Sequence, residues 1–217
     1  AGTNYRMSIN EQRIAVAVDK KVYVNDHSLN PGNWEELELH NQGEELYLSD
    51  MMLDSENQLW VAYGNWNQTL FYYEKESDLL LSRISPNNVI TEFFADSLGL
   101  GFNAISSIHE LNGDIYLGTW GDGIARFQDG AWDTFYPNSI GFPRITHSMA
   151  APDNSLWFCS GNIGAFVVPK GTLGISKYLD GKWENFNIRN SPLHSDNILG
   201  MESDIYGRKW FGAWASD

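Results

Sequence analysis

The sequence predicts an all-β protein built from repeated four-stranded sheets. Three observations lead to this fold class. Aromatic residues make up 14% of the 217 residues, and aromatic side chains are enriched in strands. The 20 glycines, with many Asn and Asp residues, supply turns. A short strand with a central aromatic residue also recurs along the whole chain at intervals of 37 to 56 residues.

Each repeat is expected to begin with a hairpin whose second strand holds this aromatic residue. The five aromatic residues are Tyr23, Trp60, Tyr116, Trp157 and Trp210. Three residues before the last four stand residues that tolerate a left-handed backbone, namely Asn57, Gly113, Asn154 and Gly207. Six residues before, an acidic residue (Asp54, Glu110 or Asp204) is placed to accept hydrogen bonds from its own turn, with Ala151 as the exception.

A second hairpin is predicted to follow in each repeat. Its last strand alternates apolar and polar residues, as half-buried strands do, at 34–37, 90–93, 132–135 and 183–186. Two of these strands follow an Asp-Gly pair, Asp129-Gly130 and Asp180-Gly181, which is a strong hairpin signal.

Two hairpins per repeat of about 40 to 50 residues are typical of a β-propeller blade. We therefore expect one incomplete propeller domain over 1–217, with blades at about 10–40, 48–95, 103–137 and 143–188 and a partial blade at 196–217. Insertions are expected around 74–88 and 168–174. Because the last repeat stops after its second strand, the remaining blades are expected to lie outside this chain. A β-sandwich with coincidental Trp spacing is the alternative.

Charge and composition exclude several classes of function. The net charge of −14 disfavours nucleic acid and anionic membranes as partners. No apolar run is long enough to cross a membrane. The five His residues lack metal-ligand spacing, and Cys159, which lies in an apolar run, reads as a buried thiol. We therefore predict no metal and no cofactor.

The phased residues resemble a known family. Residues 112–127, which read NGDIYLGTWGDGIARF, and Asp129-Gly130-Ala131-Trp132 are similar to the two-component regulator propeller repeat. This resemblance implies a seven-bladed propeller in a periplasmic sensor, or in a cell-surface or secretion-associated protein, of Bacteroidota. A periplasmic, cell-surface or secreted location is therefore expected. The single segment 152–158 is also similar to a repeat of the streptogramin lyase propellers.

The candidate ligand-binding residues are aromatic and polar residues four to six positions beyond the strand aromatics. They are Trp66, Trp120 and Trp214, with Asn65 and Asp122 beside them. Exposed Trp rings at one rim would stack on sugar rings, while the polar neighbours would bind hydroxyls. The alternative is that these rings pack between blades.

Signals for catalysis are weaker. His109 and His147 occupy nearby places in successive repeats and form a weak acid–base candidate. No nucleophile elbow or phosphate loop is visible. The sequence thus predicts a non-catalytic propeller that recognises a glycan or protein partner, with no catalytic residues. The alternatives are a structural scaffold and a propeller enzyme of lyase or glycosidase type, which would show a His, Glu or Tyr cluster with shifted pKa values at the axial mouth.

Overall fold

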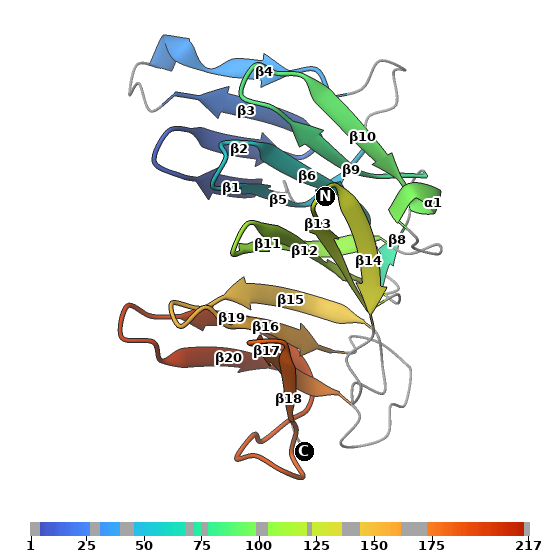
Figure 1. The fold of residues 1–217 in the computed structure, drawn as a ribbon, viewed down its shortest axis with the longest axis vertical. Helices are drawn as coiled ribbons and strands as arrows, with labels where there is room; N and C mark the ends of the chain where they lie inside the picture. The colour runs from blue at the N-terminus through green and yellow to red at the C-terminus, as the bar shows by residue number, and fades with distance from the viewer. Residues whose placement is uncertain are drawn as a thin grey trace.

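The fold was determined from a computed structural model that describes residues 5–26, 31–39, 46–67, 72–74, 78–98, 104–120, 123–135, 144–161 and 173–214. Within these ranges the chain forms four four-stranded antiparallel sheets and part of a fifth, stacked one after another in an arc (Figure 1). The predicted fold class is confirmed. No helix among the described residues is long and apolar enough to cross a membrane.

Each sheet is one blade. Blade 1 comprises β1 (Tyr5–Ile9), β2 (Ile14–Val18), β3 (Lys21–Asn25) and β4 (Glu35–Leu37). Blade 2 comprises β5 (Leu48–Leu53), β6 (Leu59–Tyr63), β9 (Leu79–Ile84) and β10 (Ile90–Phe94). Blade 3 comprises β11 (Ile105–Leu111), β12 (Asp114–Thr119), β13 (Ile124–Gln128) and β14 (Ala131–Phe135). Blade 4 comprises β15 (Ile145–Ala150), β16 (Leu156–Ser160), β17 (Gly174–Leu179) and β18 (Lys182–Phe186), and partial blade 5 comprises β19 (Ile198–Ser203) and β20 (Lys209–Ala213). The other elements are the hairpin β7 (Asn65–Asn67) and β8 (Tyr72–Glu74), the 3-10 turn η1 (Pro31–Asn33) and the short helix α1 (Ala95–Leu98).

The blade limits differ from the prediction at two places. Blade 1 already begins with β1, ahead of the expected start at residue 10, so Tyr23 lies in the third strand of its blade rather than in the second. The insertion in blade 2 is the β7–β8 hairpin, because the segment expected as an insertion contains strand β9. Strand β9 is buried on both faces and therefore lacks the alternation that marks a half-buried strand. Residues 162–172, which hold most of the second expected insertion, lie outside the described residues.

The turns before β6 and β20 are built as the sequence predicted, with Asp54 and Asp204 as acceptors, whereas Glu110 accepts from the Ser55 N–H (2.7 Å) in the turn of blade 2 and not from its own turn. Asp54 accepts hydrogen bonds from the backbone N–H groups of Glu56 (3.0 Å) and Gln58 (2.7 Å), and its other oxygen accepts one from Trp60 Nε1 (2.7 Å). Asn57 takes a positive φ of 62°. The acidic carboxylate thus fixes both the turn and the ring of the following Trp.

Aromatic rings on the second strands join neighbouring blades. The Trp60 ring, 1% exposed, meets Phe127 and Trp132 of blade 3 at centroid distances of 5.6 and 6.4 Å. The Trp157 ring meets Phe211 of blade 5 at 6.2 Å. Each ring is therefore covered by the next blade along the chain.

The two ends of the arc expose apolar faces. On β1, Tyr5, Met7 and Ile9 are 64%, 71% and 58% exposed, and on β20 the Trp210 ring is 61% exposed. These are the positions that an adjacent blade covers elsewhere in the arc. The expectation that further blades lie outside this chain stays a prediction.

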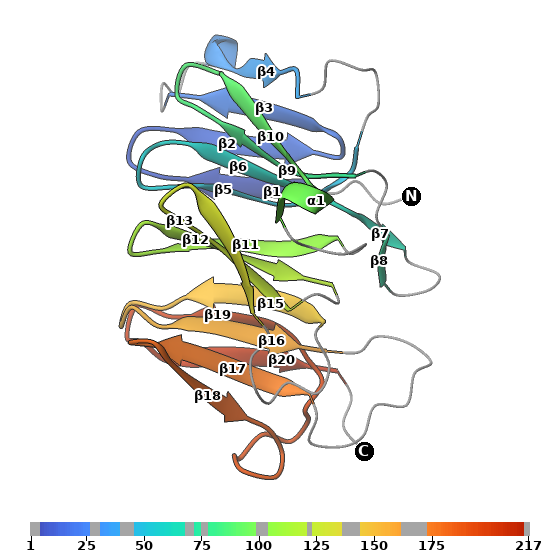
Figure 2. The ribbon, with the colours of Figure 1, turned by 45° about the vertical axis from the view of Figure 1, so that its right-hand side comes forward.

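The innermost strands β1, β5, β11, β15 and β19 contact one another in this order. The tight β5–β6 and β11–β12 turns lie at one rim of the arc, and the β7–β8 hairpin lies at the opposite rim (Figure 2). A bulge interrupts β11 and β15, and there the hydroxyl groups of Ser106 and Thr146 donate to the carbonyl oxygens of Ile145 (2.6 Å) and Ile198 (2.7 Å) on the next innermost strand. These side-chain hydrogen bonds connect neighbouring innermost strands, which do not pair through a continuous ladder of backbone hydrogen bonds.

Candidate functional site

One face of the innermost strands carries a row of polar side chains around the arc. The register with the second strand places Asp50 opposite Ala62, Ser107 opposite Gly118 and His147 opposite Cys159. Each of these partners lies two residues beyond its strand aromatic, Trp60, Tyr116 or Trp157. Asp50, Ser107 and His147 therefore occupy equivalent levels in successive blades.

The candidate pair His109 and His147 is close but not equivalent. His109 lies opposite Tyr116, one step nearer to the tight turns, at the level that Glu202 takes opposite Trp210. His109 and His147 still influence each other electrostatically, and both also respond to the charge of Glu202. The arc thus brings the two predicted His residues together with Glu202, which the sequence analysis did not select.

Each of these side chains faces the next innermost strand. Asp50 Oδ2 accepts a hydrogen bond of 2.8 Å from the backbone N–H of Ile108 on β11, and the His109 imidazole bonds to the backbone of Ser148 on β15. In contrast, residues on the opposite face of the same strands, such as Met51, Ile108 and Met201, are buried in the hydrophobic packing between blades. Alternation along the strand therefore places the polar row on the face opposite these residues, and Met52 and Met149 share the face of the row with Asp50 and His147.

Burial shifts the pKa values of this row. It raises the pKa of Asp50 to about 6, although the N–H groups of Ile108 and Met51 and the charge of Arg6 oppose the shift. It lowers the pKa of His109 to about 4, and it also lowers the pKa of His147. Near neutral pH both imidazoles are therefore uncharged, and the lowered pKa makes each a weaker base than a free imidazole.

Arg6 on β1 supplies positive charge to the same group. Its Nε donates to the carbonyl oxygen of Ser49 (2.9 Å) and its Nη1 to that of Tyr5 (2.9 Å), so backbone groups hold the guanidinium in place. The charge of Arg6 lowers the pKa of both Asp50 and His147. We name Arg6, Asp50, His109, His147 and Glu202 the axial cluster.

The axial cluster combines imidazoles and carboxylates, which can accept protons, with the fixed Arg6 guanidinium. Together these groups could carry out acid–base chemistry on a carbonyl or carboxylate compound. Among the described residues, no group of three or more His, Cys, Asp or Glu side chains is arranged to hold a metal ion. Arg6, Asp50 and Glu202 were missed because they stand out only after the strands are aligned. Asp50 and His147 each lie ten residues before the Trp of their blade.

The rim Trp residues do not form one exposed row. Trp120 is only 4% exposed, and the Arg144 guanidinium lies over its ring at 5.4 Å, so the structure favours packing over an exposed stacking surface there. Trp214 is 53% exposed. Asn65 and Trp66 lie in β7, but their side chains are outside the described residues, as is Asp122. A glycan contact by Trp66, Trp214, Asn65 and Asp122 stays a prediction.

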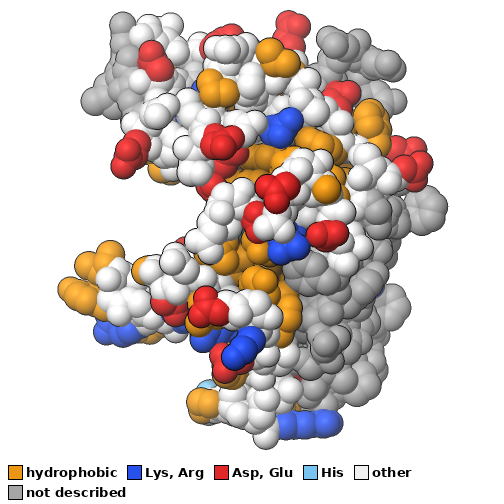
Figure 3. All heavy atoms as spheres, in the orientation of Figure 1, with side chains coloured by type: hydrophobic (Ala, Val, Ile, Leu, Met, Phe, Trp, Pro, Cys, Tyr) orange, Lys and Arg blue, Asp and Glu red, His pale blue; other side chains and the backbone are white. Residues whose placement is uncertain are grey.

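The acidic residues are not gathered into one site either. On the face shown in Figure 3, Asp and Glu side chains are spread over successive sheets. On this face the carboxylates therefore do not mark one binding patch.

Solved structures of other proteins share this fold. Virginiamycin B lyase from Staphylococcus aureus, solved as a catalytically inactive His-to-Ala variant with quinupristin, superposes with a TM-score of 0.67 at 19% identity over 97% of this chain and 62% of the lyase. The extracellular domain of a hybrid two-component system from B. thetaiotaomicron gives a TM-score of 0.63 at 15% identity over 98% of this chain and 26% of that one. A gluconolactonase from Xanthomonas campestris gives 0.58 at 13% identity over 97% and 69%.

No protein-family model and no curated protein matches the sequence. The similar structures are β-propellers, and the similarity to the two-component system domain agrees with the propeller class that the repeat resemblance implied. The chain spans about 62% of the length of the lyase.

The prediction of a non-catalytic protein is wrong in the light of these structures. Several propellers with this arrangement of blades are enzymes, namely the lyase and the gluconolactonase. The prediction relied on the absence of linear catalytic motifs. In a propeller, however, catalytic groups come from separate blades, so such motifs are not required.

Proposed function

We propose that this chain forms part of a propeller enzyme that carries out proton-transfer chemistry on a small organic molecule at the axial cluster. One observation carries the proposal: Arg6, Asp50, His109, His147 and Glu202 come from separate blades and lie on the same face of their innermost strands. Perturbed pKa values in such a cluster favour a functional site over a structural one.

In this proposal His147 exchanges the proton and Arg6 stabilises negative charge. The neutral imidazole removes a proton from the substrate, and the electron pair moves toward a carbonyl oxygen that faces the Arg6 guanidinium. When the leaving group departs, the imidazolium returns the proton to it. His109, whose ring is held by the Ser148 backbone, is a second proton acceptor in reach of the same charges. These steps describe an elimination. In a hydrolysis the imidazole instead removes a proton from a water molecule whose oxygen attacks the carbonyl carbon, and the imidazolium then protonates the departing oxygen.

The test measures turnover of quinupristin and of gluconolactone by mass spectrometry, with His147→Gln and His109→Gln variants. Loss of a general base lowers the rate by roughly 10²- to 10⁴-fold. His194→Gln is the matched control, because His194 is exposed and outside the axial cluster. Unchanged turnover in both cluster variants, or no turnover of either compound class by the parent chain, would contradict the proposal.

We also propose a location outside the cytoplasm. The similarity to an extracellular domain and the acidic, lysine-poor composition support it. Fractionation of cells that express the gene at its native level, followed by immunoblotting, tests it: recovery of the protein in the cytoplasmic fraction alone would count against this location.

A further inference from the structure

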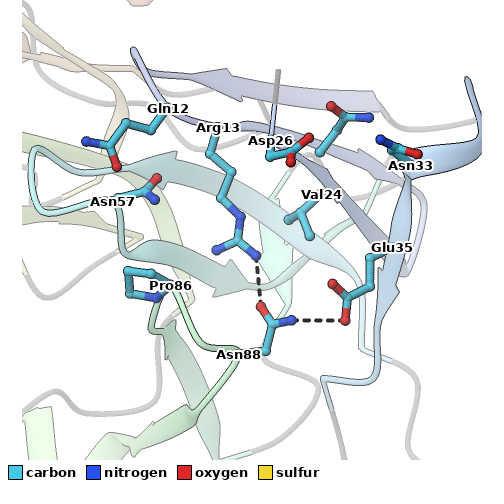
Figure 4. Close-up of a pocket in the computed structure, with 10 residues that line it drawn as sticks. Gln12, Arg13, Val24, Asp26, Asn33, Glu35, Asn57, Pro86 and Asn88 are labelled. Atoms are coloured by element: carbon cyan, nitrogen blue, oxygen red, sulfur yellow. Dashed lines mark hydrogen bonds between the residues drawn. The ribbon is translucent and has the colours of Figure 1, made fainter. Parts of the chain in front are cut away.

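A second site lies between blades 1 and 2, apart from the axial cluster. It is a cavity of about 440 Å³ on the side of the tight turns, within the size range of small-molecule sites. Its walls come from the starts of β2 and β4, the end of β3, and the turns that hold Asn57 and Asn88. Figure 4 shows these side chains converging on one space.

Two buried side chains in this cavity lack the partners that buried polar groups normally have. Arg13 is 8% exposed and Asn25 is 4% exposed. Arg13 Nη1 and both polar atoms of the Asn25 amide have no hydrogen-bond partner among the described residues. Because buried polar groups in proteins are nearly always hydrogen-bonded, such groups in a cavity wall point to a bound molecule that satisfies them.

The remaining groups hold Arg13 in position. Arg13 Nη2 donates to Asn88 Oδ1 (2.8 Å), and Asn88 Nδ2 in turn donates to Glu35 Oε1 (2.9 Å), as the dashed lines in Figure 4 show. Burial lowers the pKa of Arg13 while the charge of Glu35 raises it, and an arginine stays charged in either case. This chain of bonds fixes the guanidinium in the wall of the cavity, and Nη1 takes no part in it.

The mixture of donors and acceptors selects the class of ligand. Arg13 Nη1 and the Asn25 NH₂ group require acceptors, whereas Asn25 Oδ1 and the nearby Glu35 carboxylate require donors. A phosphate or carboxylate offers only acceptors and would face these oxygens unfavourably. A hydroxyl group both donates and accepts, so adjacent hydroxyl groups match all of these atoms.

We infer that this cavity binds a neutral polyhydroxylated molecule of the size of a mono- or disaccharide. No aromatic side chain lines the described wall of the cavity, so binding rests on hydrogen bonds to Arg13 and Asn25 rather than on ring stacking.

The experiment uses the full chain and isothermal titration with glucose, galactose, mannose and maltose, beside glucuronate and inorganic phosphate. The Asn25→Leu substitution keeps a similar side-chain volume and removes both unsatisfied polar atoms of the amide, Nδ2 and Oδ1. We expect saturable binding of at least one neutral sugar, a loss of affinity of about tenfold or more in Asn25→Leu, and an unfolding midpoint that is unchanged or higher. Thr134→Val, on an exposed outer strand, is the control and should change neither quantity.

Three results would overturn the inference: no saturable sugar binding, tighter binding of phosphate or glucuronate than of every neutral sugar, or unchanged sugar affinity in Asn25→Leu. A crystal structure from sugar-soaked crystals with only ordered water in the cavity would do the same. If Asn25→Leu fails to fold, amide shifts of the parent chain on sugar addition decide the matter, since they must include Asn25 and Asn88. None of these readouts depends on the axial cluster.

Discussion

Replacing Asp54 by alanine should destabilise the protein strongly. The side chain is 4% exposed and accepts bonds from Trp60 Nε1 and from two backbone N–H groups of its own turn. The buried Trp60 N–H loses the Asp54 carboxylate as its acceptor, while the turn N–H groups can partly recover hydrogen bonds from water. At about 1–3 kcal/mol for a buried unsatisfied donor and about 1 kcal/mol for the turn bonds, we expect a loss of about 3 kcal/mol.

Urea-induced unfolding, followed by Trp fluorescence, measures this loss. Asp204→Ala is the matched control, because Asp204 accepts from the same turn positions in blade 5. Its Trp210 bond is long, at 3.4 Å, the Trp210 ring is exposed, and its further ion pair with Arg208 (2.6 Å) lies at the surface. The control should therefore cost clearly less. Equal losses in the two variants, or a loss below about 1 kcal/mol in Asp54→Ala, would refute the argument that burial of the Trp–Asp bond sets its contribution.

Three further outcomes are expected. The pKa of Asp50 is higher in the folded than in the unfolded chain, so its contribution to stability is fully present below pH 3.8 and is lost as pH rises through about 6. The pKa of His109 is lower in the folded chain, so its contribution to stability is fully present above pH 6.5 and is lost as pH falls through about 4. In unfolding experiments between pH 4 and 6.5, the free energy of unfolding of Asp50→Asn should therefore rise with pH relative to that of the parent chain, and that of His109→Gln should fall relative to the parent. If the free energies of unfolding of both variants run parallel to that of the parent over this pH range, both assignments are contradicted. Gly118→Ala should cost about 1–3 kcal/mol in thermal unfolding, because its new Cβ would lie 2.6 Å from a side chain of blade 4, whereas Gly200→Ala, with open space around it, should be nearly neutral. Cys159 is fully buried with a raised pKa, so it should react with a thiol reagent only on unfolding; rapid labelling of the folded chain would show that this core is open.

The repeat could be predicted because its signals are local. Asp54, Asn57 and Trp60 lie within seven residues, and the turn that they form satisfies its own hydrogen bonds. Strand β9 escaped prediction because burial on both faces removes the alternation from its sequence. Strand β1 escaped because β2, the second strand of its blade, contains no aromatic residue to mark the hairpin.

The axial cluster was predicted only in part because it depends on register. His109 and His147 stand out by residue type, whereas Arg6 and Asp50 look like ordinary surface residues until the strands are aligned. Trp120 illustrates the reverse case: its spacing suggested an exposed ring, but its burial follows from Arg144 and the strand β15 of the next blade, which no local pattern reveals.

Among the described residues the main contacts between blades join neighbours in sequence, so the arc behaves as a linear array in the thermodynamic sense. A linear array unfolds from its ends, where a unit has one supporting interface instead of two. Blade 5 and the β1 face of blade 1 should accordingly fray first and exchange their amide hydrogens fastest, while blades 2 to 4 are protected from both sides. A partner that covers the exposed Tyr5, Met7, Ile9 or Trp210 surfaces would therefore slow exchange throughout the chain and not only where it binds.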